Sequence, residues 1–257
     1  MFDLHASLFG LVAILALAFI TWVTSLLKRD VSIVDSVWSL LFLAAASAYC
    51  TALPETGPRT AWIGGMLVLW ALRLTGYITW RNWGEAEDAR YQAIRARNQP
   101  YFGLKSLYLV FALQGVLAWI VSLPLLAALA SPTMPGWLDA VGLALFALGL
   151  VFETIADAQL ARFRGRAESR GKVLDSGLWR YSRHPNYFGE FCVWWGFYLI
   201  AVAAGGWWAL PAPLLMSLLL LKVSGVALLE KDIVERRPAY RDYVARTHAF
   251  LPWWSKP

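Results

Sequence analysis

Long apolar runs separated by short polar connections dominate the hydrophobic pattern of this chain. Most are long enough to cross a hydrocarbon core of roughly 30 Å, which takes about 20 apolar residues in a helix. The pattern predicts an all-α integral membrane protein of about seven transmembrane helices in a single membrane domain, residues 1–257. The predicted spans are Leu4–Leu27, Val31–Ala52, Ala61–Trp80, Leu107–Ala130, Trp137–Leu160, Phe191–Ala204 and Trp207–Leu229.

Composition points to the same class. Hydrophobic residues make up 59% of the chain and charged residues 16%, against about 25% charged in soluble proteins. The first run is too long for a cleaved signal peptide and no small-residue cleavage site follows it, so we expect a span. Cys50 and Cys192 lie in separate apolar runs. They predict buried thiols and neither a disulfide framework nor a Cys-x-x-Cys site.

The basic residues predict the orientation. Of 23 Lys and Arg residues, 20 fall within Lys28–Arg29, Arg81–Lys105, Arg162–Arg183 or Lys231–Lys256. The connections on the opposite side hold Arg59 alone. Such alternation follows the positive-inside rule and predicts an N-terminus outside and a C-terminus in the cytoplasm. Since topology explains the basic surplus, no nucleic-acid partner is expected.

Two cytoplasmic segments, Arg81–Ser106 and Ala161–Glu190, are longer than a connection between helices needs. Long segments of this kind are usually functional or disordered, and their aromatic residues and glycines favour an ordered, functional role. Within the first lies GEAEDARY, Gly84–Tyr91. Two interpretations of it stay open: a solvated charged face, or a segment that closes over a cofactor with Asp88, Arg90 and Tyr91.

Ionisable side chains inside apolar runs are costly, so each is a candidate for function. Glu153 and Asp157 are four residues apart and share one helix face. The alternative is that acids and bases pair to hold helices together, and it stays open, above all for Arg73 and Lys222. The full set is Asp35, Arg73, Glu153, Asp157, Lys222 and Glu230, with Glu190 at the start of the sixth run.

The densest group of polar residues is LWRYSRHPNYFGE, Leu178 to Glu190. Pro185 disfavours helical geometry at His184, which predicts an exposed non-helical corner. Asn186 and Glu190 then lie one turn apart on the following helix. Arginines can hold phosphates, while Asn and Glu can hydrogen-bond hydroxyls or an amide. The corner is therefore a candidate cofactor site.

The stretch SRHPNYFGE resembles the C-terminal signature of membrane steroid 5α-reductases and related sterol reductases. A shorter version, RHPxYxG, occurs in isoprenylcysteine carboxyl methyltransferases, which bind S-adenosylmethionine. The resemblance covers most of Trp70 to Trp254 and is sharpest from Glu153 to Glu190. The chain thus resembles a bacterial member of the steroid 5α-reductase family.

That resemblance implies NADPH as cofactor, held mainly by residues 153–254. Asn186 and Glu190 fall on positions that hold the nicotinamide end, and Asp157 and Arg164 on positions that contact the nucleotide. Arg73, in WALRLTGY, resembles the arginine of the cofactor wall in the third span. The other expected cofactor residues are Tyr181, Arg183, His184, Tyr187, Arg236, Tyr240 and Tyr243, with Arg236 and Arg237 proposed to cover the 2′-phosphate.

The part of the chain that is expected to bind the substrate, mainly residues 31–106, departs from the residue pattern of the family. The eukaryotic enzymes place a Glu and a Tyr at the substrate carbonyl. Here Asp35, in SIVDSVWSL, is expected to supply or orient the acid, and Trp70 stands where the Tyr would fall. An indole cannot serve as that proton donor. The expected catalytic residues are Asp35, Trp38 on the same helix face, and Arg73.

The expected activity is NADPH-dependent reduction of the Δ4 double bond of 3-oxo steroids, with an apolar substrate taken from the bilayer and the active site toward the cytoplasm of a bacterial inner membrane. One alternative is a methyltransferase that uses S-adenosylmethionine on an isoprenylcysteine or phospholipid acceptor. Another is a transporter with Asp35, Glu153 and Asp157 as an ion path. No metal site is expected, because His5, His184 and His248 have no nearby thiolate. The sequence does not predict protein partners.

Overall fold

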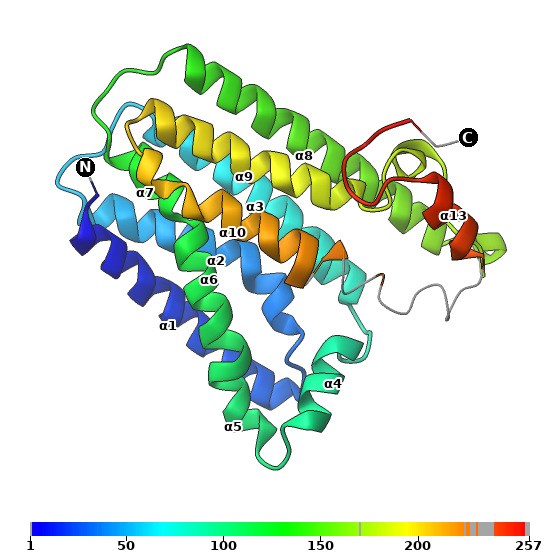
Figure 1. Cartoon of the computed structure of the whole chain (residues 1–257). Helices are drawn as coiled ribbons and strands as arrows, with labels where there is room; N and C mark the ends of the chain where they lie inside the picture. The colour runs from blue at the N-terminus through cyan, green and yellow to red at the C-terminus, as the bar shows by residue number, and fades with distance from the viewer. Residues whose placement is uncertain (1, 170, 224, 227–229, 231–238, 255–257) are drawn as a thin grey trace. The chain divides into compact units, whose positions relative to one another are not determined.

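The computed structural model describes residues 2–169, 171–223, 225–226, 230 and 239–254. Within these residues, five helices are long and apolar enough to cross a membrane. They are α1 (Leu4–Lys28), α2 (Ile33–Ala52), α3 (Thr60–Asn82), the continuous helix Phe102–Ala130 and α8 (Trp137–Arg164) (Figure 1). No strand occurs in the described part of the chain. The protein is therefore an all-helical, multi-pass membrane protein, as the hydrophobic pattern predicts.

The last two predicted spans correspond to shorter or more polar helices. α9 (Pro185–Ala203) begins before the expected Phe191, because proline is favoured in the first turn and the polar residues after it continue the helix. The seventh run forms η4 (Trp207–Ala209), α10 (Pro211–Leu218) and η5 (Leu219–Val223). Residues 224 and 227–229 of that run lie outside the described residues. Neither segment is among the five candidate spans.

The chain forms two compact units. Unit 1 comprises Met1–Pro135 with Ala204–Ala209, and unit 2 comprises Gly136–Ala203 with Leu210–Pro257. One membrane domain can contain two such units, so the expectation of a single domain stays a prediction.

In unit 1, α1 packs on α2 and α2 packs on α3. Gly10 in α1 makes room for the Tyr49 ring, since a Cβ there would lie 2.1 Å from a ring carbon. Phe42 of α2 meets Trp70 of α3 edge to face, with ring centroids 5.5 Å apart. The fourth span consists of α5 (Phe102–Ser106), η1 (Leu107–Ala112), α6 (Leu113–Val121) and α7 (Leu123–Ala130), and α6 packs against α1.

Arg59 has a structural role. It is the one basic residue in the connections that the charge pattern predicts to be poor in Lys and Arg. It is fully buried. Its guanidinium donates to the carbonyl of Thr133 at 2.6 Å and to that of Met134 at 3.4 Å. These bonds tie the start of α3 to the segment after α7, so the exception does not weaken the topological interpretation.

In unit 2, α8 and α9 run side by side in close contact (Figure 1). Glycines make this contact possible, because small residues let two helix backbones approach. A Cβ on Gly149 would lie 2.5 Å from the Gly189 carbonyl oxygen. About two turns away on each helix, a Cβ on Gly142 would lie 2.8 Å from the Gly196 oxygen. The two pairs fix the register that brings the polar end of α8 beside the start of α9.

The two long polar segments contain ordered elements, as expected. Arg81–Ser106 contains α4 (Ala89–Arg97) as well as α5, and Ala161–Glu190 contains η2 (Ala167–Ser169) and η3 (Gly177–Arg180). α13 (Tyr240–Arg246) lies near the C-terminus.

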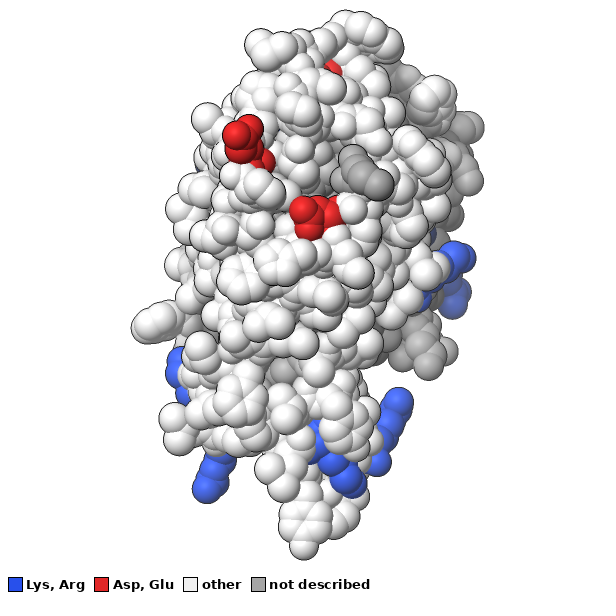
Figure 2. Space-filling view, turned by 90° about the vertical axis from the view of Figure 1, so that its left-hand side faces the viewer, with Lys and Arg blue, Asp and Glu red and all other residues white. Residues whose placement is uncertain are grey.

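Most of the surface on the face shown in Figure 2 carries no charged side chain. Large apolar side chains of α1 are exposed on the molecule, among them Phe9 (47%) and Val12 (63%). A soluble protein rarely exposes a broad apolar surface, whereas lipid-facing helices do so by necessity.

Candidate functional site

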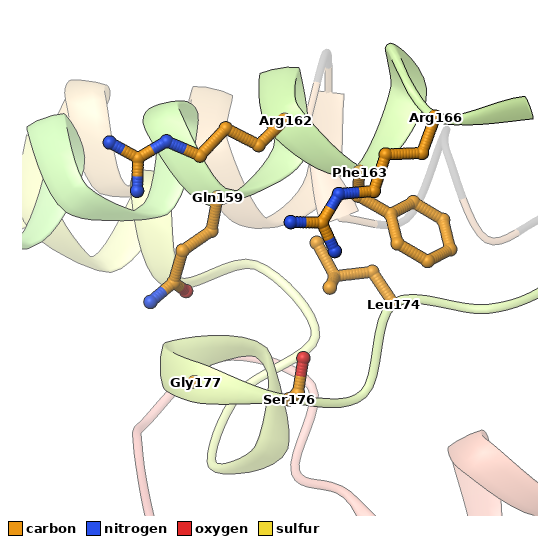
Figure 3. A pocket seen from close by; sticks show the side chains of 7 residues that line it. All are labelled: Gln159, Arg162, Phe163, Arg166, Leu174, Ser176 and Gly177. Atoms are coloured by element: carbon orange, nitrogen blue, oxygen red, sulfur yellow. The ribbon is translucent and has the colours of Figure 1, made fainter. Parts of the chain in front are cut away.

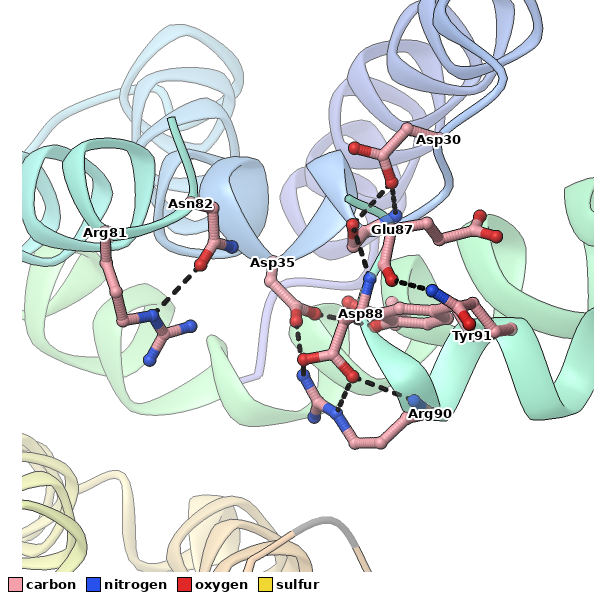
Figure 4. Close-up of polar contacts among 11 residues, drawn as sticks. Asp30, Asp35, Arg81, Asn82, Glu87, Asp88, Arg90 and Tyr91 are labelled. Carbon is pink, nitrogen blue, oxygen red and sulfur yellow. Dashed lines mark hydrogen bonds and ion pairs between the residues drawn. The ribbon is translucent and has the colours of Figure 1, made fainter. Parts of the chain in front are cut away.

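A polar cluster at the start of α2 in unit 1 centres on Asp35 (Figure 4). The Tyr91 hydroxyl donates to Asp35 Oδ1 at 2.6 Å, and Arg90 Nη2 donates to Oδ2 at 2.7 Å. Gln114 Nε2 in turn donates to the Tyr91 oxygen at 3.0 Å. Both carboxylate oxygens of Asp35 therefore accept from donors supplied by α4.

The turn before α4 secures this arrangement. Asp88 caps α4 by accepting from the Arg90 N–H at 2.9 Å, and it also accepts from Arg90 Nε. Glu87 accepts from the Val31 N–H at 2.9 Å and from Arg95 Nη2 at 2.6 Å. GEAEDARY is thus folded onto the start of α2 and is not simply a solvated charged face. Local capping preferences of Asp explain where α4 begins.

Tyr91 is suited to hold a proton. Its side chain is buried, and burial together with the neighbouring Asp35 carboxylate raises the pKa of the Tyr91 hydroxyl well above its usual range. The phenol therefore stays protonated at neutral pH. The geometry makes Tyr91 the proton carrier that is hydrogen-bonded to Asp35.

The other expected catalytic residues lie in unit 1 as well. Trp38 follows Asp35 by one turn, is half-buried, and meets Phe42 edge to face at 5.3 Å. Trp70 is fully buried. Arg73 places its guanidinium over the Tyr77 ring, 5.6 Å from the centroid. Asp35 forms an ion pair with Arg90 of α4.

A second polar cluster lies in unit 2, where α9 begins beside α8. Asn186 Nδ2 donates to Asp157 Oδ1 at 3.2 Å. One turn along α9, Glu190 accepts from Trp194 Nε1 at 3.0 Å. The side chains of Glu153, Asp157 and Glu190 are all buried. The glycine contacts between the helices thus bring together three residues, Asp157, Asn186 and Glu190, that the resemblance assigns to cofactor binding.

The expectation of an exposed corner at His184 is wrong. Arg183 and His184 are only 7% and 5% exposed. The Arg183 guanidinium donates twice to the Glu230 carboxylate, each time at 2.7 Å, and also to the carbonyls of Val244 and Thr247. His184 Nε2 lies 2.9 Å from Glu230 Oε1. Arg183 is thereby occupied within the chain, which gives it a structural role.

The C-terminal segment covers this corner and explains its burial. The Arg183 N–H donates to the His248 carbonyl at 2.9 Å, and the Ser182 hydroxyl to the Phe250 carbonyl at 2.7 Å. The Tyr243 hydroxyl donates to the Trp179 carbonyl. A local pattern around Pro185 cannot reveal a cover that comes from a segment far along the chain.

The remaining expected cofactor residues surround the same corner or lie outside the described residues. The Tyr187 ring stacks on His184, with centroids 5.5 Å and planes 4° apart. Arg164 is exposed in the last turn of α8. Tyr181 meets Trp254, and Tyr240 meets Tyr243, both edge to face. Arg236 and Arg237 lie outside the described residues.

Two residues hold these clusters together that the sequence analysis left without a specific role: Gln114 was not among its candidates, and Glu230 was a candidate with no assigned partner. Gln114 supports Tyr91, and Glu230 binds both Arg183 and His184. A polar residue within or beside an apolar run was the signal in both cases. Their partners are distant in sequence, so the role could not be assigned.

The Glu230 cluster predicts a pH-dependent stability. Burial alone raises the pKa of Glu230, but the hydrogen bonds from Arg183 and His184 outweigh it and lower the pKa to about 2 from 4.5. A lowered folded-state pKa stabilises the protein above the unfolded value, and this contribution is lost as the pH falls toward the folded value. Glu230→Gln should therefore lower the Tm by several degrees near neutral pH, because a hydrogen bond to a charged group contributes about 1.5–3 kcal/mol.

Thermal unfolding of wild type and Glu230→Gln in detergent, followed from about pH 7 to about pH 3, measures this difference. It should shrink across the acid range. Glu168→Gln removes an exposed acid of the same unit and should change little. A Tm difference that stays constant down to the lowest pH would contradict the ion-pair interpretation.

The chain shares 26% identity with "Uncharacterized protein C594.04c" of Schizosaccharomyces pombe over 274 aligned residues, which cover 95% of this chain and 78% of that protein. No solved structure shows a significant match. A family model described as "Protein of unknown function (DUF1295)" matches residues 21–247. The helical membrane protein described above, with both of its polar clusters inside the matched region, belongs to the DUF1295 family.

Proposed function

We propose that the protein is an NADPH-dependent reductase of a conjugated enone in an apolar substrate, of which a 3-oxo-Δ4 steroid is the expected type. The observation that carries the proposal is the contact of Asn186 with Asp157 beside the buried Glu190. These side chains come from α8 and α9 and share one small region. The resemblance to steroid 5α-reductases implies a cofactor at the same residues.

The chemistry of this donor set fits the cofactor. The amide of Asn186 can both donate and accept, and carboxylates accept from ribose hydroxyls or from the nicotinamide amide. Arg164 offers a cation for a phosphate, and guanidinium groups bind phosphate in a bidentate manner. Arg183 is left out of the phosphate set because Glu230 and two carbonyls occupy it. NADPH, when bound, supplies the hydride that adds to the β-carbon of the enone.

The Asp35 cluster supplies the acid. In the proposed reaction the Tyr91 hydroxyl turns to the substrate carbonyl oxygen and donates its proton there as negative charge develops, so hydride addition gives the enol. The enol becomes the saturated ketone when water protonates its α-carbon and its O–H proton returns to Tyr91. Gln114 continues to donate to the Tyr91 oxygen, which stabilises that oxygen while its proton is on the substrate. Arg90 holds Asp35 in position through their ion pair. This assigns the proton to Tyr91 and makes Asp35 the group that positions the hydroxyl before the substrate binds.

The proposal includes the finer topology. We propose seven spans, with α9 and the Trp207–Val223 helix as the last two, an N-terminus outside and a C-terminus in the cytoplasm. The basic residues of the alternate connections support this orientation. In a bacterium the membrane would be the inner membrane, the active site would face the cytoplasm, and the substrate would enter from the bilayer.

Cofactor binding is the first test. Asn186→Ala should raise the dissociation constant of NADPH about tenfold or more, because a buried hydrogen bond to a ligand contributes about 1–3 kcal/mol. Glu190→Gln should weaken binding in the same direction. Titration of detergent-purified protein with NADPH, followed by nicotinamide fluorescence, gives both constants.

Asn82→Ala is a matched control, since the Asn82 side chain accepts from its neighbour Arg81 at the end of α3. It should bind NADPH as wild type does. The same preparation is titrated with S-adenosylmethionine. Saturable binding of S-adenosylmethionine without NADPH binding would replace the reductase with a methyltransferase, and unaltered NADPH titrations in both variants would remove the assigned cofactor site.

A further inference from the structure

A small pocket opens in unit 2 at the end of α8 (Figure 3). On one side it is lined by Gln159 and Arg162 of α8 and by Arg166, two residues beyond the end of that helix. On the other it is lined by the segment that carries Ser176 and Gly177. Figure 3 shows the Gln159 side chain extending from α8 toward that segment, the Arg166 side chain extending from the chain just beyond α8 into the space above Leu174, and the Arg162 side chain lying along α8. Phe163 and Leu174 complete the lining.

The wall beside Gln159 is fixed by the fold. Gln159 Oε1 accepts from the Leu178 N–H at 3.0 Å, which leaves its amide N–H groups as donors. Gly177 has φ of 61°, and a Cβ there would lie 2.4 Å from Gln159 Nε2. The backbone conformation therefore favours glycine, and a side chain at this position would displace the Gln159 amide. The pocket has a built polar wall.

The lining is rich in donors and carries no acid. Among the described residues, the guanidinium groups of Arg162 and Arg166 and the hydroxyl of Ser176 donate to no group of the chain. Asp175, which precedes Ser176 of the lining, is paired with Arg246. Exposed Glu168, two residues after Arg166, does not line the pocket. Two cations in a lining without an acid form an electrostatic site for an anion.

The position and size of the pocket limit the class of ligand that it can bind. Arg162 lies in the last turn of α8, a candidate membrane span. The end of a span lies at the depth of lipid headgroups, where basic pockets bind phosphate-bearing headgroups. A volume of about 180 Å3 is below the roughly 300–1,000 Å3 of sites that enclose a drug-sized ligand. The pocket suits a phosphate group and the atoms next to it.

We propose that this pocket binds a phosphate ester, with Arg162 and Arg166 on the phosphate oxygens and Gln159 and Ser176 donating beside them. The phosphate can belong to a phospholipid headgroup or to a small soluble molecule, and both present the same chemistry. Arg164, assigned above to the reductase cofactor, follows Arg162 by two residues and so points roughly 200° away from it around α8. The pocket is thus separate from the Asp157–Asn186 cluster and does not rest on the proposed function.

The test uses full-length protein in a micelle of neutral detergent, and the shift of Tm with ligand concentration is the readout. Three probes separate the sources: dihexanoylphosphatidylglycerol, glycerol 3-phosphate and inorganic phosphate. Saturable stabilisation by the lipid alone identifies a headgroup site. Stabilisation by glycerol 3-phosphate or inorganic phosphate, in addition to stabilisation by the lipid, identifies a site for a small soluble phosphate compound. Either result supports the proposal.

Arg162→Gln and Arg166→Gln should each weaken the binding about tenfold, because charge-assisted hydrogen bonds to phosphate are strong. The double variant should bind weaker still. Arg241→Gln removes the same charge from an exposed position of the same unit and should bind as wild type does. Both pocket arginines are exposed, so folding should survive. The proposal is overturned if no probe stabilises wild type, if the double variant binds normally, or if Arg241→Gln loses as much.

Discussion

Tyr91→Phe should lower the turnover of a 3-oxo-Δ4 steroid by about 10²–10⁴-fold, the usual range for the loss of a general acid. The substitution keeps the buried ring and removes the hydroxyl that lies 2.6 Å from Asp35 and 3.0 Å from Gln114. Asp35→Asn should also lower turnover, but it disturbs the Arg90 ion pair as well. Tyr91→Phe is therefore the cleaner change. Single-turnover NADPH oxidation in micelles measures the effect.

Two controls make this result specific. Tyr108→Phe removes the hydroxyl of a tyrosine that is 60% exposed and should leave turnover unchanged. NADPH affinity of Tyr91→Phe should match that of wild type, because Tyr91 is assigned to the substrate. Normal turnover of Tyr91→Phe, or a loss fully explained by weaker NADPH binding, would reject the proton-donor role and leave the cluster as a structural tie between α2 and α4.

Gly149→Ala and Gly189→Ala should destabilise the protein by about 3 kcal/mol or more, because overpacking against backbone cannot be relieved by a side-chain movement. A Cβ on Gly149 would lie 2.5 Å from the Gly189 oxygen, and one on Gly189 would lie 2.6 Å from the Glu153 nitrogen. The Tm should fall by roughly 6–12 °C. Because the same contacts hold Asp157 beside Asn186, NADPH binding should weaken too.

Gly76→Ala in α3 is the matched control, since a Cβ there meets nothing within 4 Å. Alanine has the higher helix propensity by about 1 kcal/mol, so this variant should be as stable as wild type or more stable. Gly149→Ala should lower the Tm and Gly76→Ala should keep or raise it, so the comparison separates the effect of close helix contact from that of helix propensity. Equal effects of Gly149→Ala and Gly76→Ala on Tm would show that the α8 and α9 backbones do not depend on the glycines.

Several features of the fold follow from the sequence because they depend on local composition. The first, second, third and fifth predicted runs are each a complete helix of the required length in nearly the expected position. The fourth run is also a helix, but it begins earlier than expected, at Phe102. A run of about 20 apolar residues must form a helix in lipid, where every backbone group needs an internal partner. Asp88 and Pro185 also act locally, as the cap of α4 and the first residue of α9.

Other features were not accessible from the sequence because they depend on partners far along the chain. GEAEDARY left two interpretations open, and only the contacts of Glu87 with Val31 and of Tyr91 with Asp35 decided that it covers the start of α2. The proposed proton donor changed from Asp35 to Tyr91 for the same reason, since the contacts of Arg90 and Tyr91 with Asp35 join residues far apart in the sequence.

The sequence by itself determined the class of protein, the alternation of apolar runs and basic connections, and the concentration of polar residues between Glu153 and Glu190. These depend on hydrophobicity and on charge near each span. Only the tertiary structure decided which of those polar residues face one another. The close approach of α8 and α9 at Gly149 and Gly189 joined Asp157 to Asn186, and the C-terminal segment buried Arg183 against Glu230. Side-chain partners across 29 and 47 positions are set by packing of whole helices, which no local pattern specifies.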